Sequence, residues 1–351
     1  MFSDFIKEYS VADKEAWNEA VKKYKKYDVF YLNEYVSAFM QENEENGEPV
    51  LIVYNNGEDY AINVVFRRDI EKAELFRNKI ESGKYYDLIS PYGYGGFIGQ
   101  ISDYNVLNRA YKEYCEKTGY ISEFVRFELY GDYCEHFEGE IETRTHNVVR
   151  NLEMPIDEIW MDFKQKVRKN VKRAIKNNLE IVLDETGALL DDFLNVYYGT
   201  MERTQAEGKF FFSRSFFEII NQMKGHFIYF HVKKDNIVIS TELVIYGTDT
   251  CYSYLGGTNS EYFDLRPNDF LKYEVIKWAN NKGLKKFVLG GGYGSDDGIF
   301  QYKTCLAPNG IVDFYIGRRI LNDRLYEKLV QLRKKLSDRE LNEKYFPLYR
   351  S

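Results

Sequence analysis

The sequence lacks the features that mark secreted and membrane proteins. Its four cysteines (Cys115, Cys134, Cys251, Cys305) lie far apart and form no CxxC pair, which argues against a disulfide scaffold. No run approaches the roughly 18 apolar residues needed to cross a bilayer, and no hydrophobic leader follows Met1. We therefore expect a cytoplasmic protein with reduced, mostly buried thiols.

An excess of basic charge is also missing, since 48 Lys and Arg face 55 Asp and Glu for a net charge of -7. This balance opposes general attraction to nucleic acid or anionic lipid, so a polyanionic partner must bind a local basic patch. With only 6 prolines and no Ser/Gly-rich tract, nothing indicates disorder. A length of 351 residues exceeds what one core usually supports and predicts two domains.

The order of predicted elements indicates a mixed α/β architecture in each half. Apolar spacing predicts helices at 13–25, 33–46 and 104–119, and two apolar runs separated by NNGED predict a hairpin. Near residues 150–160 a proline precedes an acidic helix start, which is typical of a boundary. We place the domains at 1–152 and 153–351, and the second half repeats the order of elements of the first, with a further helix predicted at 268–281.

One predicted helix concentrates basic charge. Between Asp162 and Glu180 there is no acid, and Phe163, Val167 and Val171, with Ala174 or Ile175, form the apolar stripe of a helix. Its outer face could meet phosphates or simply face water. The seven basic residues are Lys164, Lys166, Arg168, Lys169, Lys172, Arg173 and Lys176.

Two glycine-rich segments are candidate ligand-binding loops. PYGYGG at 91–96 allows close backbone approach and presents Tyr92 and Tyr94. GGGYGSDDGIFQYK at 290–303 has no Lys-Ser/Thr at P-loop spacing, and we expect no helix after its glycines of the kind a dinucleotide fingerprint needs. Asp296 and Asp297 lack a third ligand in spacing, so no metal site is predicted.

In chain order, KVRKNVKRAIKNNLEIV, YYGTMERTQAEGKFFFSRSFFEII, YSYLGGT, KWANNKGLKKFVLGGG and GIFQYKTCLAPNGIVDFYIG resemble the Fem-type aminoacyltransferases, which belong to the GNAT-like acyltransferases. The resemblance covers about residues 150–318 and extends to PYGYGG. It implies two tandem GNAT-like domains, each a mixed sheet flanked by helices, and transfer of an acyl group to an amine. In the best-known members the donor is aminoacyl-tRNA and the acceptor is a peptidoglycan precursor.

The resemblance also implies roles for particular residues. Lys303 corresponds to the lysine that stabilises the oxyanion of the tetrahedral intermediate, and Tyr302 stands where the family has phenylalanine. Substrate-binding positions would be Tyr92, Tyr94, Arg203, Arg214, Tyr254, Gly291 and Gly292. Lys164, Arg168, Lys169, Lys172 and Arg173 would contact tRNA or phosphate.

The identity of the donor and of the acceptor has several alternatives. The turn before the helix at 268–281 lacks the [RQ]xxGx[GA] pattern of acetyl-CoA enzymes, which favours charged tRNA as donor, with no bound cofactor. The acceptor would be a UDP-linked or lipid-linked muropeptide, with peripheral contact to the membrane surface as an option. One alternative is an N-acyltransferase that uses acetyl-CoA or another acyl-CoA on a cell-surface sugar or peptide. Another is a non-catalytic nucleic-acid-binding protein.

Overall fold

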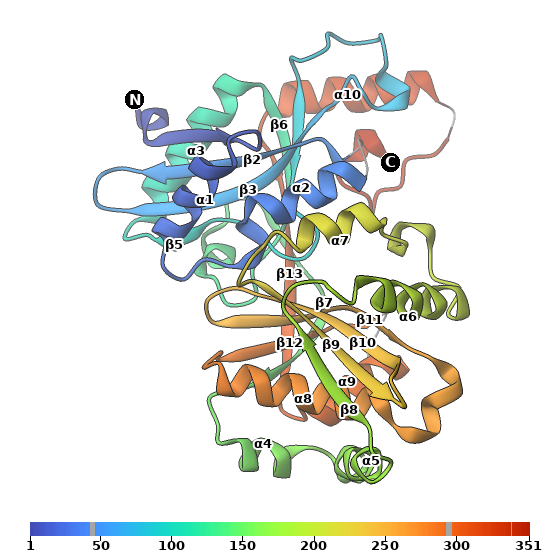
Figure 1. The fold of residues 1–351 in the computed structure, drawn as a ribbon. Coiled ribbons are helices and arrows are strands. Elements are labelled where there is room, and N and C mark those ends of the chain that lie inside the picture. The colour runs from blue at the N-terminus through green and yellow to red at the C-terminus, as the bar shows by residue number, and fades with distance from the viewer. Residues whose placement is uncertain (43–45, 293–296, 338) are drawn as a thin grey trace. The chain divides into compact units, whose positions relative to one another are not determined.

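The structure is a computed structural model that describes residues 1–42, 46–292, 297–337 and 339–351 (Figure 1). The chain forms two compact units: unit 1 comprises Met1–Arg144 and Phe314–Ser351, and unit 2 comprises Thr145–Asp313. The sequence assigned residues 314–351 to the second domain, whereas in the structure they pack with the first. The reason is that strand β13 (Ile311–Ile320) pairs with β6 (Tyr120–Arg126) of unit 1, a long-range contact that has no local sequence signal.

Unit 1 is a mixed sheet with helices packed on it. Its strand order is β1-β2-β3-β4-β6-β13, with β5 paired to β3, and β4 with β6 is its parallel pair. Helix α3 contributes Leu107, Ala110 and Tyr111 to the core against the sheet. The remaining elements are β1 Ile6–Ser10, α1 Lys14–Lys23, α2 Asn33–Glu42, β2 Glu48–Asn55, β3 Tyr60–Asp69, β4 Tyr86–Ile89, β5 Ile98–Gln100, α3 Tyr104–Thr118 and α10 Asp323–Leu336.

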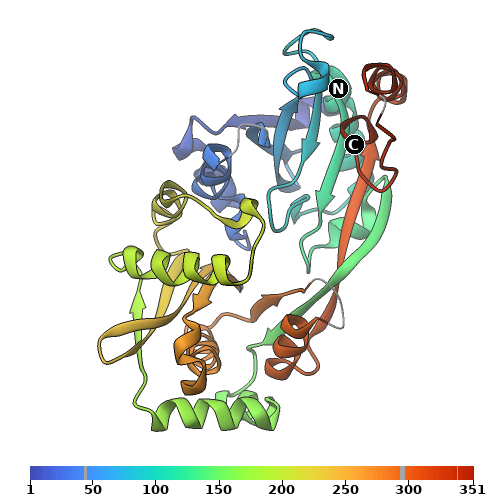
Figure 2. The same cartoon turned by 90° about the vertical axis from the view of Figure 1, so that its right-hand side faces the viewer.

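Unit 2 repeats this arrangement. Its strand order is β8-β9-β10-β11-β12-β7, and β11 with β12 is its parallel pair. Figure 2 shows α6 and α8 on opposite faces of these strands, and α5 packs into the core on the α8 side through Val167 and Val171. The elements are β7 Glu140–Asn151, which enters unit 2 at Thr145, α4 Ile156–Asp162, α5 Gln165–Lys176, β8 Glu180–Asp184, α6 Leu190–Arg203, α7 Arg214–Ile220, β9 Phe227–Lys234, β10 Ile237–Tyr246, β11 Thr250–Thr258, α8 Pro267–Asn281, β12 Lys286–Gly290 and α9 Gly298–Leu306.

The predicted repeat of elements is confirmed. Unit 1 runs β1-α1-α2-β2-β3-β4-α3-β6, with β5 inserted before α3, and unit 2 runs β8-α6-α7-β9-β10-β11-α8-β12. The expectation that no helix follows the glycines after residue 290 is wrong, because α9 begins at Gly298. The side chain of Asp297 caps this helix by accepting from the Ile299 backbone N–H at 2.9 Å. No described helix is both long and apolar enough to cross a bilayer.

The end of α3 provides a test of the unit 1 fold. Gly119 has φ +76, and a Cβ there would lie 2.4 Å from the Lys84 carbonyl oxygen. We expect Gly119→Ala to lower the free energy of unfolding by about 1–3 kcal/mol, measured by urea titration. Gly199→Ala is the control, because nothing lies within 4 Å of its Cβ position in α6, and it should stabilise by up to about 1 kcal/mol. Equal effects of the two substitutions would contradict the left-handed cap.

Candidate active site

A cavity opens in unit 2 where two parallel strands part. The pairing of β11 with β12 covers only residues 250–252 and 286–288. Beyond it, residues 253–258 of β11 and four residues of α9 line a cavity of about 420 Å³. The glycines of β11 allow close packing of α6, since a Cβ at Gly257 would lie 2.3 Å from the Oγ1 of Thr200, another residue that lines the cavity. Strand divergence therefore creates the space, and α9 and β11 form two of its walls.

Lys303 of α9 is one of the residues that line this cavity. Its Nζ donates to the Gly291 carbonyl oxygen at 2.6 Å, and Gly290, with φ +80, turns the chain at the end of β12. Burial lowers the pKa of Lys303 to about 8, and the nearby positive charge of Lys272 adds to the shift, while Glu242 and Asp297 oppose it. The lysine is thus anchored, partly desolvated and still mostly protonated at neutral pH.

A buried ion pair lies in the same cavity. Lys272 of α8 donates to Glu242 Oε1 of β10 and to Ser253 Oγ of β11, each at 2.5 Å. The two charged residues are only 8% and 3% exposed, yet both line the cavity. None of these three residues is predicted from the sequence motifs. The available signal was a single acid within the otherwise uncharged strand IVISTELVIY, because an isolated buried charge is costly unless it is paired.

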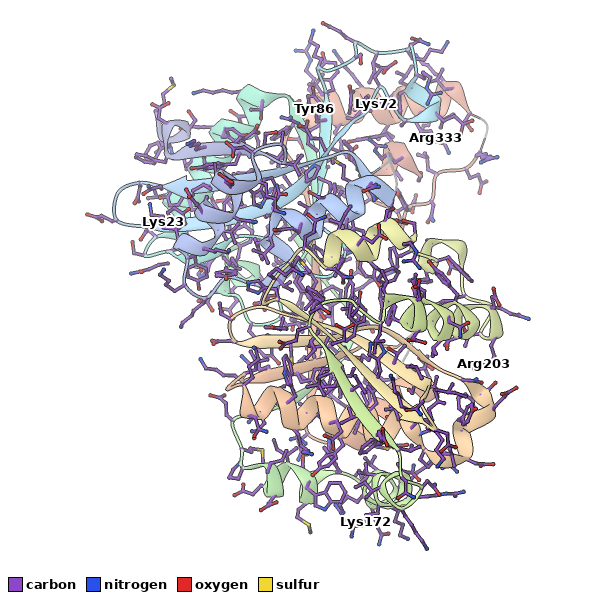
Figure 3. The ribbon with its side chains drawn as sticks, viewed as in Figure 1. Lys23, Lys72, Tyr86, Lys172, Arg203 and Arg333 are labelled. Atoms are coloured by element: carbon purple, nitrogen blue, oxygen red, sulfur yellow. The ribbon has the colours of Figure 1, made fainter. Side chains whose placement is uncertain are left out.

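Four predicted site residues line the cavity: Lys303, Tyr302, Arg203 and Tyr254. The Tyr302 hydroxyl is buried and has no hydrogen-bond partner, and burial raises its pKa well above the ordinary range. Arg203 lies at the end of α6 (Figure 3), where its guanidinium stands 5.1 Å from the ring of Phe263, another cavity residue. The roles of these residues stay predictions.

The glycines of the loop fall near Lys303 rather than on the cavity wall. Gly291 accepts the Lys303 hydrogen bond through its carbonyl oxygen. A Cβ at Gly292 would lie 2.4 Å from Asp297 Oδ2, so a larger residue here would have to displace the carboxylate that caps α9. Asp296 lies outside the described residues. Among the described residues no cluster of three or more His, Cys, Asp or Glu could hold a metal ion.

Three predicted substrate-binding residues lie elsewhere. Arg214 forms surface ion pairs with Asp191 and Glu218 and is not among the cavity residues. Tyr94 is a core residue of unit 1, only 8% exposed, and packs against the rings of Phe30 and Phe314.

A groove role for Tyr94 therefore conflicts with its packing, because PYGYGG turns this side chain inward. Tyr92 of the same unit is 48% exposed.

The predicted basic helix is α5, and its stripe is buried as expected through Val167, Val171 and Ala174, whereas Ile175 is exposed. Lys164, Lys169, Lys172 and Arg173 are exposed, and Lys172 points outward from the helix (Figure 3). Arg168 differs, because its guanidinium donates to the backbone oxygens of Met161 and Phe163. It therefore stabilises the α4–α5 connection.

Asp269, near the start of α8, supplies a test of burial next to the cavity. Burial raises its pKa to about 6, against a hydrogen bond from Asn170 at 3.1 Å that lowers it. A raised carboxyl pKa means that the native state binds more protons than the unfolded state between about pH 4 and 6, so stability falls as pH rises through that window.

We therefore expect Asp269→Asn to raise the free energy of unfolding at pH 7 by about 1–3 kcal/mol. The gain should vanish below about pH 4, where both side chains are neutral. Urea titrations at pH 4 and 7 measure it, with Asp264→Asn, an exposed residue of the preceding turn, as control. A loss of stability at pH 7 would show that the carboxylate is compensated.

The chain is similar in sequence to known acyltransferases. Residues 162–304 match the family described as Acetyltransferase (GNAT) domain. A lipid II:glycine glycyltransferase from Staphylococcus haemolyticus (strain JCSC1435) is 25% identical over 109 residues, which are 29% of this chain and 26% of that protein. The chain thus matches about a quarter of this relative's length.

Solved structures show the same fold. A crystal structure of FemX superposes with a TM-score of 0.66 at 16% identity, covering 92% of this chain and 99% of that one. The C-terminal domain of a putative lysylphosphatidylglycerol synthetase from Agrobacterium fabrum gives a TM-score of 0.54 at 11% identity, covering 90% and 94%. The predicted GNAT-like fold is confirmed: a GNAT domain model matches residues 162–304, and FemX shares the fold over most of the chain.

Proposed function

We propose that this protein is an aminoacyltransferase that moves an amino acid from aminoacyl-tRNA to the stem-peptide amine of a peptidoglycan precursor in the cytoplasm. The similar glycyltransferase is named for lipid II and glycine, which supports a muropeptide as the acceptor. The single observation that carries the proposal is Lys303, anchored to Gly291 and lining the cavity between β11 and α9.

The chemistry matches this placement. The acceptor amine attacks the ester carbonyl carbon of the donor, a C–N bond forms, and negative charge develops on the carbonyl oxygen. The C–O bond to the carrier then breaks, and the proton lost by the amine ends on the released carrier oxygen. A fixed ammonium beside the carbonyl oxygen lowers the barrier, because it stabilises charge that exists only in the intermediate.

The donor is argued from charge and from backbone shape. The exposed cations of α5 offer an RNA backbone a contact surface on unit 2. Before α8, where acetyl-CoA enzymes place a glycine-rich phosphate turn, this chain has a 3-10 helix at Ser260–Leu265 and then Arg266 at φ +63. This geometry favours charged tRNA over acyl-CoA.

Substitution of Lys303 tests the function. We expect Lys303→Met to lower kcat for transfer from charged tRNA to a UDP-linked or lipid-linked muropeptide by about 10²–10³-fold. Lys285→Met is the control, because Lys285 is partly exposed and pairs with Asp249. Because the ammonium is the active form and its pKa in the free protein is about 8, wild-type kcat/KM should fall as pH rises through 8. Transfer from acyl-CoA alone would overturn the proposal.

Charge reversal on α5 tests the donor. Lys169, Lys172 and Arg173 replaced together by Glu should raise KM for charged tRNA about tenfold or more, and reduce the salt dependence of binding by about 2–3 logarithmic units per decade. Reversal of Lys328, Lys334 and Lys335 on α10, all exposed, is the matched control. If both triple variants change KM equally, then net charge rather than this surface governs binding.

A further inference from the structure

The floor of the unit 2 cavity holds polar atoms that the described residues leave unsatisfied. Glu242 Oε2 is buried and accepts no hydrogen bond, and the Tyr302 hydroxyl is in the same state. Lys272 has three N–H donors, and Glu242 and Ser253 account for two of them. Buried polar groups are normally paired in native proteins, so a polar ligand is the natural partner for this set.

A contribution to the stability of the fold does not readily explain the Glu242–Lys272 ion pair. Replacing a buried pair by well-packed apolar residues is often neutral or stabilising, and Glu242 is followed in its strand by the fully buried apolar residues Leu243 and Val244. Both partners line the cavity that contains Lys303. Their position beside the reacting group indicates binding rather than support of the fold.

We propose that the Glu242 carboxylate binds the α-amino group of the acyl unit being transferred. Lys272, which also donates to Ser253, holds the Glu242 carboxylate in place. The proposal rests on the aminoacyl transfer proposed above. It identifies Glu242 as the residue that lets the protein discriminate an aminoacyl donor from an acyl donor that has no amine.

The charges around the cavity define how the amine binds. Arg203, Lys272 and Lys303 supply three cations, and Glu242 supplies the one carboxylate among the lining residues. A further ammonium would be repelled, whereas a neutral amine donates one N–H to Glu242 Oε2 and keeps its lone pair free. An acetyl group carries no donor, so it would leave Oε2 buried and unpaired. Sites built to hydrogen-bond a substrate group reject analogues that lack it for this reason.

The test compares two donors that differ only in the amine. A short RNA hairpin carries either a glycyl or an acetyl ester at its 3′ end, and kcat/KM is measured with each. The wild type should prefer glycyl by about 10- to 100-fold. Glu242→Gln should reduce the preference at least tenfold, because its one amide oxygen accepts from Lys272 and its NH₂ then faces the ligand amine. Glu274→Gln is the control. Glu274 lies on the same helix as Lys272, but its carboxylate pairs with Lys277, so this variant should keep the preference for the glycyl donor.

Binding measurements separate this proposal from the proposed function. Calorimetry with hairpins carrying non-hydrolysable amide-linked glycyl or acetyl groups should show the same preference, lost in Glu242→Gln. The double variant Glu242→Gln, Lys272→Met removes both charges together and should also lose it, which covers a single variant that does not fold. Equal binding of the two analogues by wild type, or an unchanged preference in the variants, overturns the role of Glu242. Absence of transfer with intact binding preference overturns the aminoacyltransferase instead.

Discussion

The parting of β11 from β12 after residue 252 is the constraint on which the candidate site depends. Up to that point residues 250–252 are held by parallel pairing with residues 286–288, and Cys251 and Phe287 belong to the core. Beyond it, the backbone edge of β11 and the start of α9 face a shared space. Ser253, the first residue past the pairing, already binds Lys272 instead of a neighbouring strand's side chain. The transition from core to site therefore occurs within one residue.

Unit 1 carries the same parallel pair and uses it differently. There β4 pairs with β6 from Tyr86 to Ile89, and the chain leaves at Ser90 but returns. The Gly95 N–H donates to the Arg126 carbonyl oxygen at 2.6 Å, and Gly95 forms a bridge with Phe127. Tyr94 then fills the interior against Phe30. The same topology thus closes on itself in unit 1 and opens in unit 2, which explains why PYGYGG resembles a binding loop in sequence but places one of its tyrosines in the core.

Local patterns predicted much of the fold, and long-range pairings account for what they missed. Helix α3 and its Gly119 cap, the β2–β3 hairpin and the buried stripe of α5 each follow from residues close together in the chain. The return of β13 to unit 1 depends on pairing with a strand almost 200 residues earlier, which periodicity does not record. Lys303 was found by resemblance to a family motif. Glu242 and Lys272, which line the same cavity, come from two other elements, and only the tertiary structure brings them together.

Two buried ion pairs, one in each unit, differ in how completely their polar groups are paired. In unit 1, both carboxylate oxygens of Glu123 are paired: one accepts from Tyr111 and the other from the Arg319 guanidinium, which also donates to Tyr133. In unit 2, the Glu242 and Lys272 pair leaves one carboxylate oxygen and one N–H without a partner among the described residues. A pair that serves the fold gains from complete pairing, since each unmatched buried group costs free energy. The incomplete pair lies in the cavity wall, where a bound molecule can complete it, and this difference in pairing is the physical basis for proposing a binding role in unit 2.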